Sequence, residues 1–255
     1  MPPMKKILLS TLLSTLLMAA TAEQVEQYLS ISNSDEQLVE LETQFSQMQE
    51  NFNSLGQAQD TQQYNMQMLS IRFKEYLQKH LSEDEMEEIL KAYRNVLLLQ
   101  YVSAVSESQS VEPEEIEKYI RELESDPEMH ERITLVNKIS DEMYDPQSMA
   151  VMFDNLMKPL LENAPGGDKL DKKVLDERRK IYIERMQEET RKETLYATRD
   201  FTLEELEKLE EIAKLPVIKQ ETRAVFGATA YALEEFFLSL AKRYDIQKHQ
   251  PSKQP

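Results

Sequence analysis

The sequence predicts an all-α protein built from two related bundles of amphipathic helices, with little or no β structure. Apolar residues recur at steps of three and four along most of the chain, which is the period of a helix with one buried face. No stretch of useful length alternates with period two, so strands are not expected. In addition, two segments that lie 120 residues apart, 81–87 and 201–207, read alike.

Each of these two segments is a complete signal for the start of a helix. Ser82 and Thr202 can cap a helix, and the Glu three positions further on can return a bond to the cap residue. The apolar residue before each cap can also pack against one in the first turn, as a hydrophobic staple. The same offset pairs Met66 with Met186, Tyr76 with Tyr196, Gln100 with Gln220, and Ala104-Val105 with Ala224-Val225. A duplicated helical unit is therefore predicted.

The N-terminus has the pattern of a secretory signal peptide over residues 1–22. Lys5 and Lys6 precede an apolar run of about 12 residues, and Ala20 and Ala22 stand at the positions that a signal peptidase reads. The run is shorter than the roughly 20 residues of a membrane-spanning helix, so an uncleaved anchor is the less favoured alternative. We expect secretion across the inner membrane and a periplasmic location.

Composition and charge narrow the class of protein further. The chain has no Cys, which excludes a lipoprotein anchor, and its 40% apolar residues are enough for a core without disulfides. Only 4 Gly and no further apolar run of spanning length argue against barrels and integral membrane proteins once the signal is cleaved. A formal charge of −17 disfavours binding to nucleic acid or anionic lipid.

The apolar pattern and the capping residues define the elements of the first unit, residues 23–110. A short apolar-spaced segment at 25–31 is followed by three longer amphipathic patterns, of which the first is stopped by Gly56. The expected helices run from Ser34 to Leu55, from Asp60 to Leu77 and from Ser82 to Leu99.

Proline and glycine divide the rest of the chain. Pro113, Pro127 and Pro146 each fit the first turn of a helix, whereas Pro159 should kink or end the helix that contains it. The strongest break is at 164–167, which reads Ala-Pro-Gly-Gly. Further helices are expected at 168–198, from Thr202 to Pro216, and at 217–244. The predicted organisation is a signal at 1–22, a first unit at 23–110, a connecting helix at 111–130, a second unit at 131–246 and a disordered tail at 247–255.

Segment 25–34, Val-Glu-Gln-Tyr-Leu-Ser-Ile-Ser-Asn-Ser, resembles the opening of an exported bacterial family catalogued as domain of unknown function 2059. The segment from Phe201 to Leu206, followed by Pro216, is similar to a later helix start of that family, and Leu81 to Tyr93 matches it in part. A second opening segment at 133–140 would make two tandem copies. The resemblance implies an all-helical envelope protein and carries no catalytic residues.

Catalytic signatures are absent from the sequence. It contains no nucleophile elbow, no zinc-binding His-Glu-x-x-His and no Gly-rich phosphate loop. His80, His130 and His249 are each isolated, which favours surface roles. We expect no metal and no cofactor.

Methionine offers the one candidate binding surface. Met149, Met152, Phe153 and Met157 share one region and partly one helical face. Ordinary core filling is the simplest explanation, while an adaptable peptide groove and a Cu(I) site are alternatives, because thioethers serve all three purposes.

The sequence therefore favours a non-catalytic periplasmic protein that binds another envelope protein or a peptide. One alternative is an envelope hydrolase that uses scattered carboxylates, which would need two carboxyl groups about 5 to 10 Å apart in a cleft. The other is a carrier of a small apolar ligand, which would need a cavity of several hundred cubic ångströms. The oligomeric state is left open.

Overall fold

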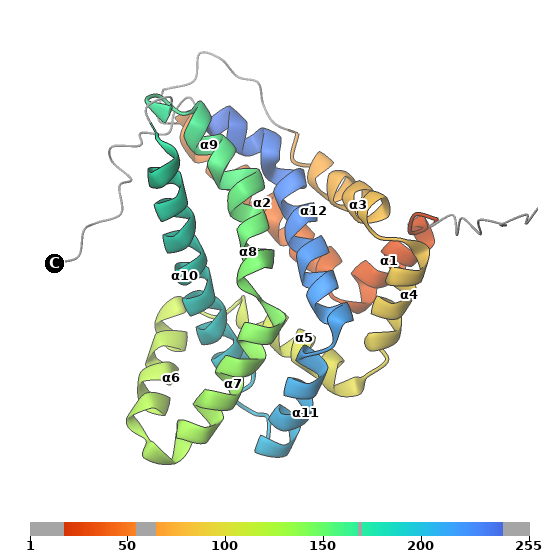
Figure 1. Ribbon diagram of the computed structural model, residues 1–255, viewed down its shortest axis with the longest axis vertical. Coiled ribbons are helices and arrows are strands. Elements are labelled where there is room, and N and C mark those ends of the chain that lie inside the picture. Colours follow the sequence, from red (N-terminus) through yellow and green to blue (C-terminus); the bar gives the residue numbers. More distant parts are fainter. Residues whose placement is uncertain (1–17, 55–64, 168–169, 242–255) are drawn as a thin grey trace, which may run out of the picture.

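The computed structural model describes residues 18–54, 65–167 and 170–241 (Figure 1). Of the residues it describes, 84% are helical and none lies in a strand, which confirms the predicted all-α fold. Among the described residues, Ala19 and Ser82 form an isolated antiparallel β-bridge.

Five helices form the first half of the chain and the others form the second. The first five are α1 (Ala22–Ile31), α2 (Ser34–Ser54), α3 (Met68–His80), α4 (Glu83–Ala92) and α5 (Val96–Ser108). They are followed by α6 (Pro113–Ser125), the 3-10 turn η1 (Pro127–Met129), α7 (His130–Met143), α8 (Pro146–Met152), the π-helical turn η2 (Phe153–Met157), α9 (Lys158–Asn163), α10 (Lys172–Ala197), α11 (Leu203–Ala213) and α12 (Pro216–Ala241).

Both predicted capping boxes are confirmed. The Ser82 amide donates to Glu85 at 2.7 Å, and the Glu85 amide donates back to the Ser82 hydroxyl at 3.3 Å. At the start of α11 the matching bonds between Thr202 and Glu205 are 2.8 and 3.2 Å long. Hydrogen bonds from the cap residue's backbone lower the pKa of both glutamates, as expected when the charged form accepts them.

The helix expected from Ser82 to Leu99 is interrupted, so that part of the prediction is wrong. The helix ends at Ala92, and Asn95 caps α5 by accepting a hydrogen bond from the Leu97 amide at 2.9 Å. Short polar side chains can bond to the backbone N–H and C=O groups that a helix would otherwise use. The spacing of apolar residues does not reveal such bonds. The predicted helix end at Gly56 and the cap at Asp60 lie outside the described residues, as do residue 168 and the tail at 247–255.

Pro159 neither ends its helix nor leaves it regular. The chain continues from α8 into α9 through η2, where the Lys158 amide bonds to the Phe153 carbonyl five residues back. Proline has no N–H and its ring crowds the carbonyl four residues before it, which here belongs to Asn155. A π-helical turn at that place widens the helix and accommodates both effects. The predicted break after α9 is present, with Gly166 at a φ of 84°.

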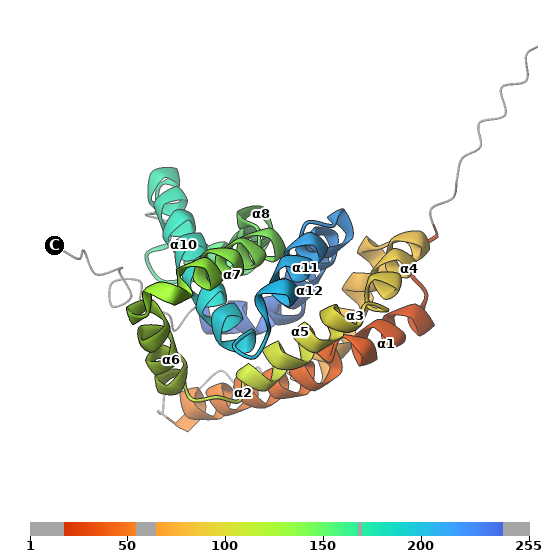
Figure 2. The same ribbon diagram turned by 90° about the horizontal axis from the view of Figure 1, so that it is seen from below.

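The two halves of the chain share a single core. Figure 2 shows α1 to α5 along one side of the molecule and α7, α8, α10, α11 and α12 along the other. Packing between the sides is reciprocal, because α3 lies against α12 and α10 lies against α5. Under the 120-residue offset, α3 corresponds to the end of α10 and α5 to the start of α12, and the duplicated unit stays a prediction. The buried cluster accordingly includes Leu77 and Met86 together with Leu206 and Leu233.

The helix α12 is central to this packing, and it contacts α3, α4, α7, α8 and α9. By length and composition it could also cross a membrane, so the expectation that no further run reaches spanning length is wrong. Buried core helices pass the same test. Gly227 brings α12 against α3, because a Cβ atom there would collide with the Tyr76 ring and hydroxyl.

The N-terminal end of the described chain packs on the first capping box. The Ala20 amide donates to the Leu81 carbonyl at 2.9 Å, and the Glu83 amide donates to the Met18 carbonyl at 2.8 Å. Thr21 caps α1 in a third capping box, with Gln24 as its partner. Residues 18–22 thus belong both to the described fold and to the predicted signal peptide of residues 1–22, which stays a prediction.

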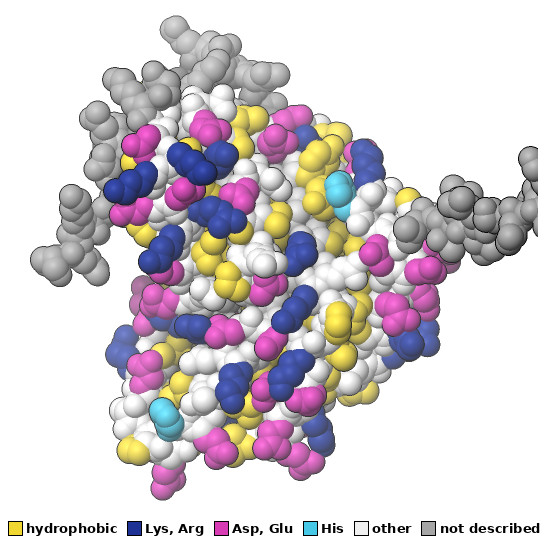
Figure 3. Space-filling model, in the orientation of Figure 1, with side chains coloured by type: hydrophobic (Ala, Val, Ile, Leu, Met, Phe, Trp, Pro, Cys, Tyr) yellow, Lys and Arg dark blue, Asp and Glu magenta, His cyan; other side chains and the backbone are white. Residues whose placement is uncertain are grey.

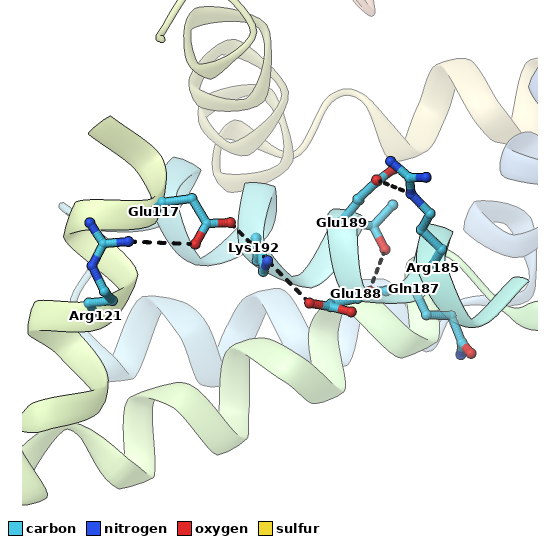
Figure 4. Close-up of polar contacts among 8 residues, drawn as sticks. Glu117, Arg121, Arg185, Gln187, Glu188, Glu189 and Lys192 are labelled. Carbon is cyan, nitrogen blue, oxygen red and sulfur yellow. Dashed lines mark hydrogen bonds and ion pairs between the residues drawn. The ribbon is translucent and has the colours of Figure 1, made fainter. Parts of the chain in front are cut away.

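Ion pairs on the surface connect α6 to α10 (Figure 4). Lys192 Nζ lies 2.9 Å from a carboxylate oxygen of Glu117 and 3.1 Å from one of Glu188. The hydrogen bond from Lys192 lowers the pKa of Glu117. On the face shown in Figure 3, acidic, basic and apolar side chains are interspersed. Because these pairs are solvent-exposed, they orient the helices more than they stabilise the fold.

Candidate functional site

The candidate site is a cavity of about 140 Å³ at the junction of α1, α5 and α12, which we call the tyrosine cavity. Aromatic and acidic groups from several elements meet in it: Tyr28, Tyr93, Tyr101, Tyr144, Phe226 and Glu221. The other lining residues are apolar side chains with Ser32, Ser34, Gln37 and Thr222. No Lys, Arg or His is among the residues that line it.

Local sequence explains how the tyrosines reach the cavity. Tyr28 shares the buried face of α1 with Val25 and Leu29, as their spacing requires. Tyr93 and Tyr144 are the C-cap residues of α4 and α7, and each amide closes the last turn of its helix. The ends of α4 and α7 and the faces of α1 and α5 therefore each bring one tyrosine to the cavity.

Glu221 is the polar centre of the tyrosine cavity. One carboxyl oxygen, Oε1, accepts hydrogen bonds from the hydroxyl of Tyr28 at 2.8 Å and from that of Tyr93 at 2.5 Å. The rings of these tyrosines meet edge to face, with centroids 6.0 Å apart. The other oxygen, Oε2, receives no hydrogen bond from any described residue, so it is free to bind a ligand.

Burial changes the acid–base properties of the site. It raises the pKa of Glu221 to about 7, although the two tyrosine hydrogen bonds act in the opposite direction. Burial and the nearby Glu221 charge raise the pKa values of Tyr28 and Tyr93 well above the ordinary value. The neighbouring Tyr101, together with burial, does the same for the pKa of Tyr144. Near neutral pH the tyrosines are therefore uncharged donors, and Glu221 is the one lining group that changes its charge.

Tyr101 is the unusual member of the group. It is 3% exposed, and its hydroxyl makes no hydrogen bond of normal geometry to the described residues, although Thr194 and Tyr144 lie close enough to influence its pKa. Buried polar side chains are almost always hydrogen-bonded, so each exception calls for an explanation. Tyr101 also lies 120 residues before Glu221, the same offset that relates the capping boxes. The two corresponding positions on α5 and α12 thus line one cavity.

The methionine face predicted as a binding surface lies elsewhere. Met149 is fully buried and Phe153 is 3% exposed, while Met152 and Met157 are half-buried. α8 and η2, which carry these residues, pack against α10 and α12. This placement is that of ordinary core filling, the simplest of the three explanations, and binding at this face stays a prediction.

A second hollow lies beside α9 and the start of α10. Its volume is about 420 Å³, and charges of both signs line it, including Asp154, Glu162, Asp176, Lys158, Lys172 and Arg179. Arg179 neutralises Asp154 through two bonds of 2.9 and 3.0 Å. Within the described ranges no cluster of three or more His, Cys, Asp or Glu could hold a metal ion. His80 bonds to its own helix, at the carbonyl of Tyr76.

The sequence did not lead us to predict Tyr28, Tyr93, Tyr101, Tyr144 or Glu221 as site residues. One signal was present. Glu221 follows Ile218 by three positions and precedes Val225 by four, so it interrupts the apolar stripe of α12. An acid in such a stripe indicates a buried carboxyl group, but its partners come from helices that are distant in sequence.

No protein-family model, curated protein or solved structure matches this chain. The resemblance to domain of unknown function 2059 therefore stays an expectation, and the site is interpreted from its own geometry.

Proposed function

We propose that this chain is an exported, non-catalytic binding protein and that the tyrosine cavity holds its ligand. The observation that carries the proposal is the buried, unpartnered hydroxyl of Tyr101 in the same cavity as the free Oε2 atom of Glu221. An unsatisfied buried polar group costs about 1–3 kcal/mol. A ligand that bonds to these atoms would recover that cost on binding.

The volume limits what can enter. The cavity of about 140 Å³ is close to the roughly 150 Å³ that accommodates benzene in a protein core. A compact molecule fits, and so does one side chain of a partner peptide, which keeps peptide binding within the proposal. A larger apolar cargo, for which several hundred cubic ångströms are needed, is less well supported.

The chemistry of the cavity favours binding over hydrolysis. Glycan cleavage by acid and base needs two carboxyl groups that flank the substrate, and Glu221 is the one carboxyl group that lines the cavity. Export to the periplasm rests on the N-terminal pattern of residues 1–22 and belongs to the proposal on that basis.

The proposal can be tested by filling the cavity. Val225 lines it, so Val225→Phe should occupy the space, whereas Val96 is 66% exposed on α5 and Val96→Phe serves as the matched control. A library of compact fragments would be screened for a rise in the melting temperature, because a ligand that binds the folded state stabilises it. Hits are expected with the wild type and the control and not with Val225→Phe. Hits that persist in Val225→Phe, or a screen without hits, would refute the proposal.

A further inference from the structure

The tyrosine cavity carries a negative charge without a compensating cation. Lys, Arg and His are missing from its lining, and Glu221 bonds only to tyrosine hydroxyls among the described residues. A buried carboxylate without a counter-charge is costly, and it attracts any cation that can reach it. The free oxygen, Oε2, is the natural point of contact.

The walls of the cavity are suited to the same kind of ligand. Five aromatic rings line it, and the face of each ring carries negative potential that attracts cations. The edge-to-face arrangement of Tyr28 and Tyr93, with planes at 81°, makes two walls of a corner. Tyr144 and Phe226 form a second ring pair, with centroids 6.5 Å apart. Aromatic cages of this kind bind quaternary ammonium groups in proteins.

Hydrogen-bonding capacity separates methylated from unmethylated amines. A primary ammonium group has three N–H donors and loses all its hydration on entry. The cavity offers it Oε2 of Glu221, the Tyr101 hydroxyl and the side chains of Gln37 and Thr222, while the hydroxyls of Ser32 and Ser34 already bond to each other. Much of the remaining wall is apolar, with Val102, Met143 and Val225. A fully methylated ammonium group has no N–H donor, so it needs no acceptors and places its methyl groups against that wall. Its few heavy atoms are also compatible with about 140 Å³.

We propose that the tyrosine cavity binds a small methylated ammonium group, with the cation beside Oε2 of Glu221 and against the tyrosine rings. This inference rests on the proposed function, because it names the ligand class of the same cavity. The group could belong to a free molecule such as choline or to a methylated lysine side chain of a peptide. The shared chemistry is the methylated cation, and the experiment distinguishes the two sources.

The test compares a cation with its uncharged copy. Titration calorimetry of the full chain at about pH 8, where Glu221 is ionised, would use choline and the alcohol in which a tert-butyl group replaces trimethylammonium. Choline is expected to bind at least about tenfold more tightly than the alcohol. A capped trimethyl-lysine peptide forms the third arm, and tighter binding of the peptide than of choline assigns the group to a partner protein.

Two variants locate the effect within the cavity. Glu221→Gln keeps the shape and removes the charge, so choline binding should weaken about tenfold or more while the alcohol is unaffected. Glu207→Gln removes an exposed acid that does not line the cavity, so it should retain choline binding. If choline and the alcohol bind equally well, the inference of a methylated cation is wrong. The proposed function, binding of a compact ligand in the cavity, would still stand. Absence of binding by all three probes would overturn the inference, and the fragment screen would then decide the proposed function separately.

Discussion

The half-buried, partly dehydrated carboxyl group of Glu221 gives the free energy of unfolding a defined dependence on pH. Its pKa is raised from the ordinary 4.5 to about 7 in the folded protein, so the folded state holds its proton where the unfolded state has lost it. The stabilising contribution is fully present below about pH 4.5 and is lost as the pH rises through about 7. Each pH unit of that window is worth about 1.4 kcal/mol, so the total is about 3 kcal/mol.

Glu221→Gln isolates this contribution from the other acids. Glutamine keeps the size and can still accept the hydrogen bonds from Tyr28 and Tyr93, but it does not titrate. These tyrosines, and Tyr144 beside them, have raised pKa values and remain uncharged throughout the window. The difference in unfolding free energy, wild type minus Glu221→Gln, should therefore fall by about 3 kcal/mol between pH 4.5 and 7.5.

Urea denaturation followed by far-ultraviolet circular dichroism is the appropriate assay, because helices dominate the fold and the measurement needs no tryptophan. Glu207 is exposed on α11 and supplies the control, since Glu207→Gln removes one acid without touching the cavity. Its difference from the wild type should change little over the same pH range. A difference for Glu221→Gln that stays flat, or that rises with pH, would show that the carboxyl group is not buried as described.

Three further outcomes follow from the structure. Thr202→Ala should lower the unfolding free energy by about 1 kcal/mol in urea titrations and leave ligand binding unchanged, since the cap is structural. Gly227→Ala should cost about 1–3 kcal/mol through contact with Tyr76, and a double-mutant cycle with Tyr76→Phe should recover part of that loss if the hydroxyl is responsible. A chain that begins at Glu23 should melt below one that begins at Met18, by the equivalent of about 1 kcal/mol, and equal melting temperatures would contradict the described cap of α1.

Features set by local sequence were predicted well. The boxes at Ser82 and Thr202 need only four consecutive residues each, and prolines at 113 and 146 mark helix starts because the missing N–H is tolerated there. The prediction was wrong at Asn95, where a side chain redirected the backbone against a continuous apolar pattern. It was incomplete at Pro159, where a widened turn maintained the helix.

The candidate site was missed for a different reason. Tyr28, Tyr93 and Glu221 are separated by up to 193 residues in sequence, and their hydrogen bonds exist only after three helices have packed. Each tyrosine alone is a normal core residue, because its ring is largely apolar. Glu221 in the apolar stripe of α12 was the single local clue, and its position in the sequence does not show which residues bond to it. Prediction of such a site requires the topology, which the apolar pattern leaves undetermined.

The helices α5 and α12 each contribute an unlike polar residue to the cavity, Tyr101 and Glu221. If the two halves descend from one duplicated unit, as the offset predicts, Tyr101 and Glu221 occupy the same position in each copy. Two carboxyl groups there would repel each other in one cavity, and two tyrosines would leave it without charge. With one of each, a single carboxyl group and the Tyr101 hydroxyl line the same cavity. On the proposals of a repeat and of ligand binding, divergence between the copies at this position supplies the cavity with its single carboxyl group.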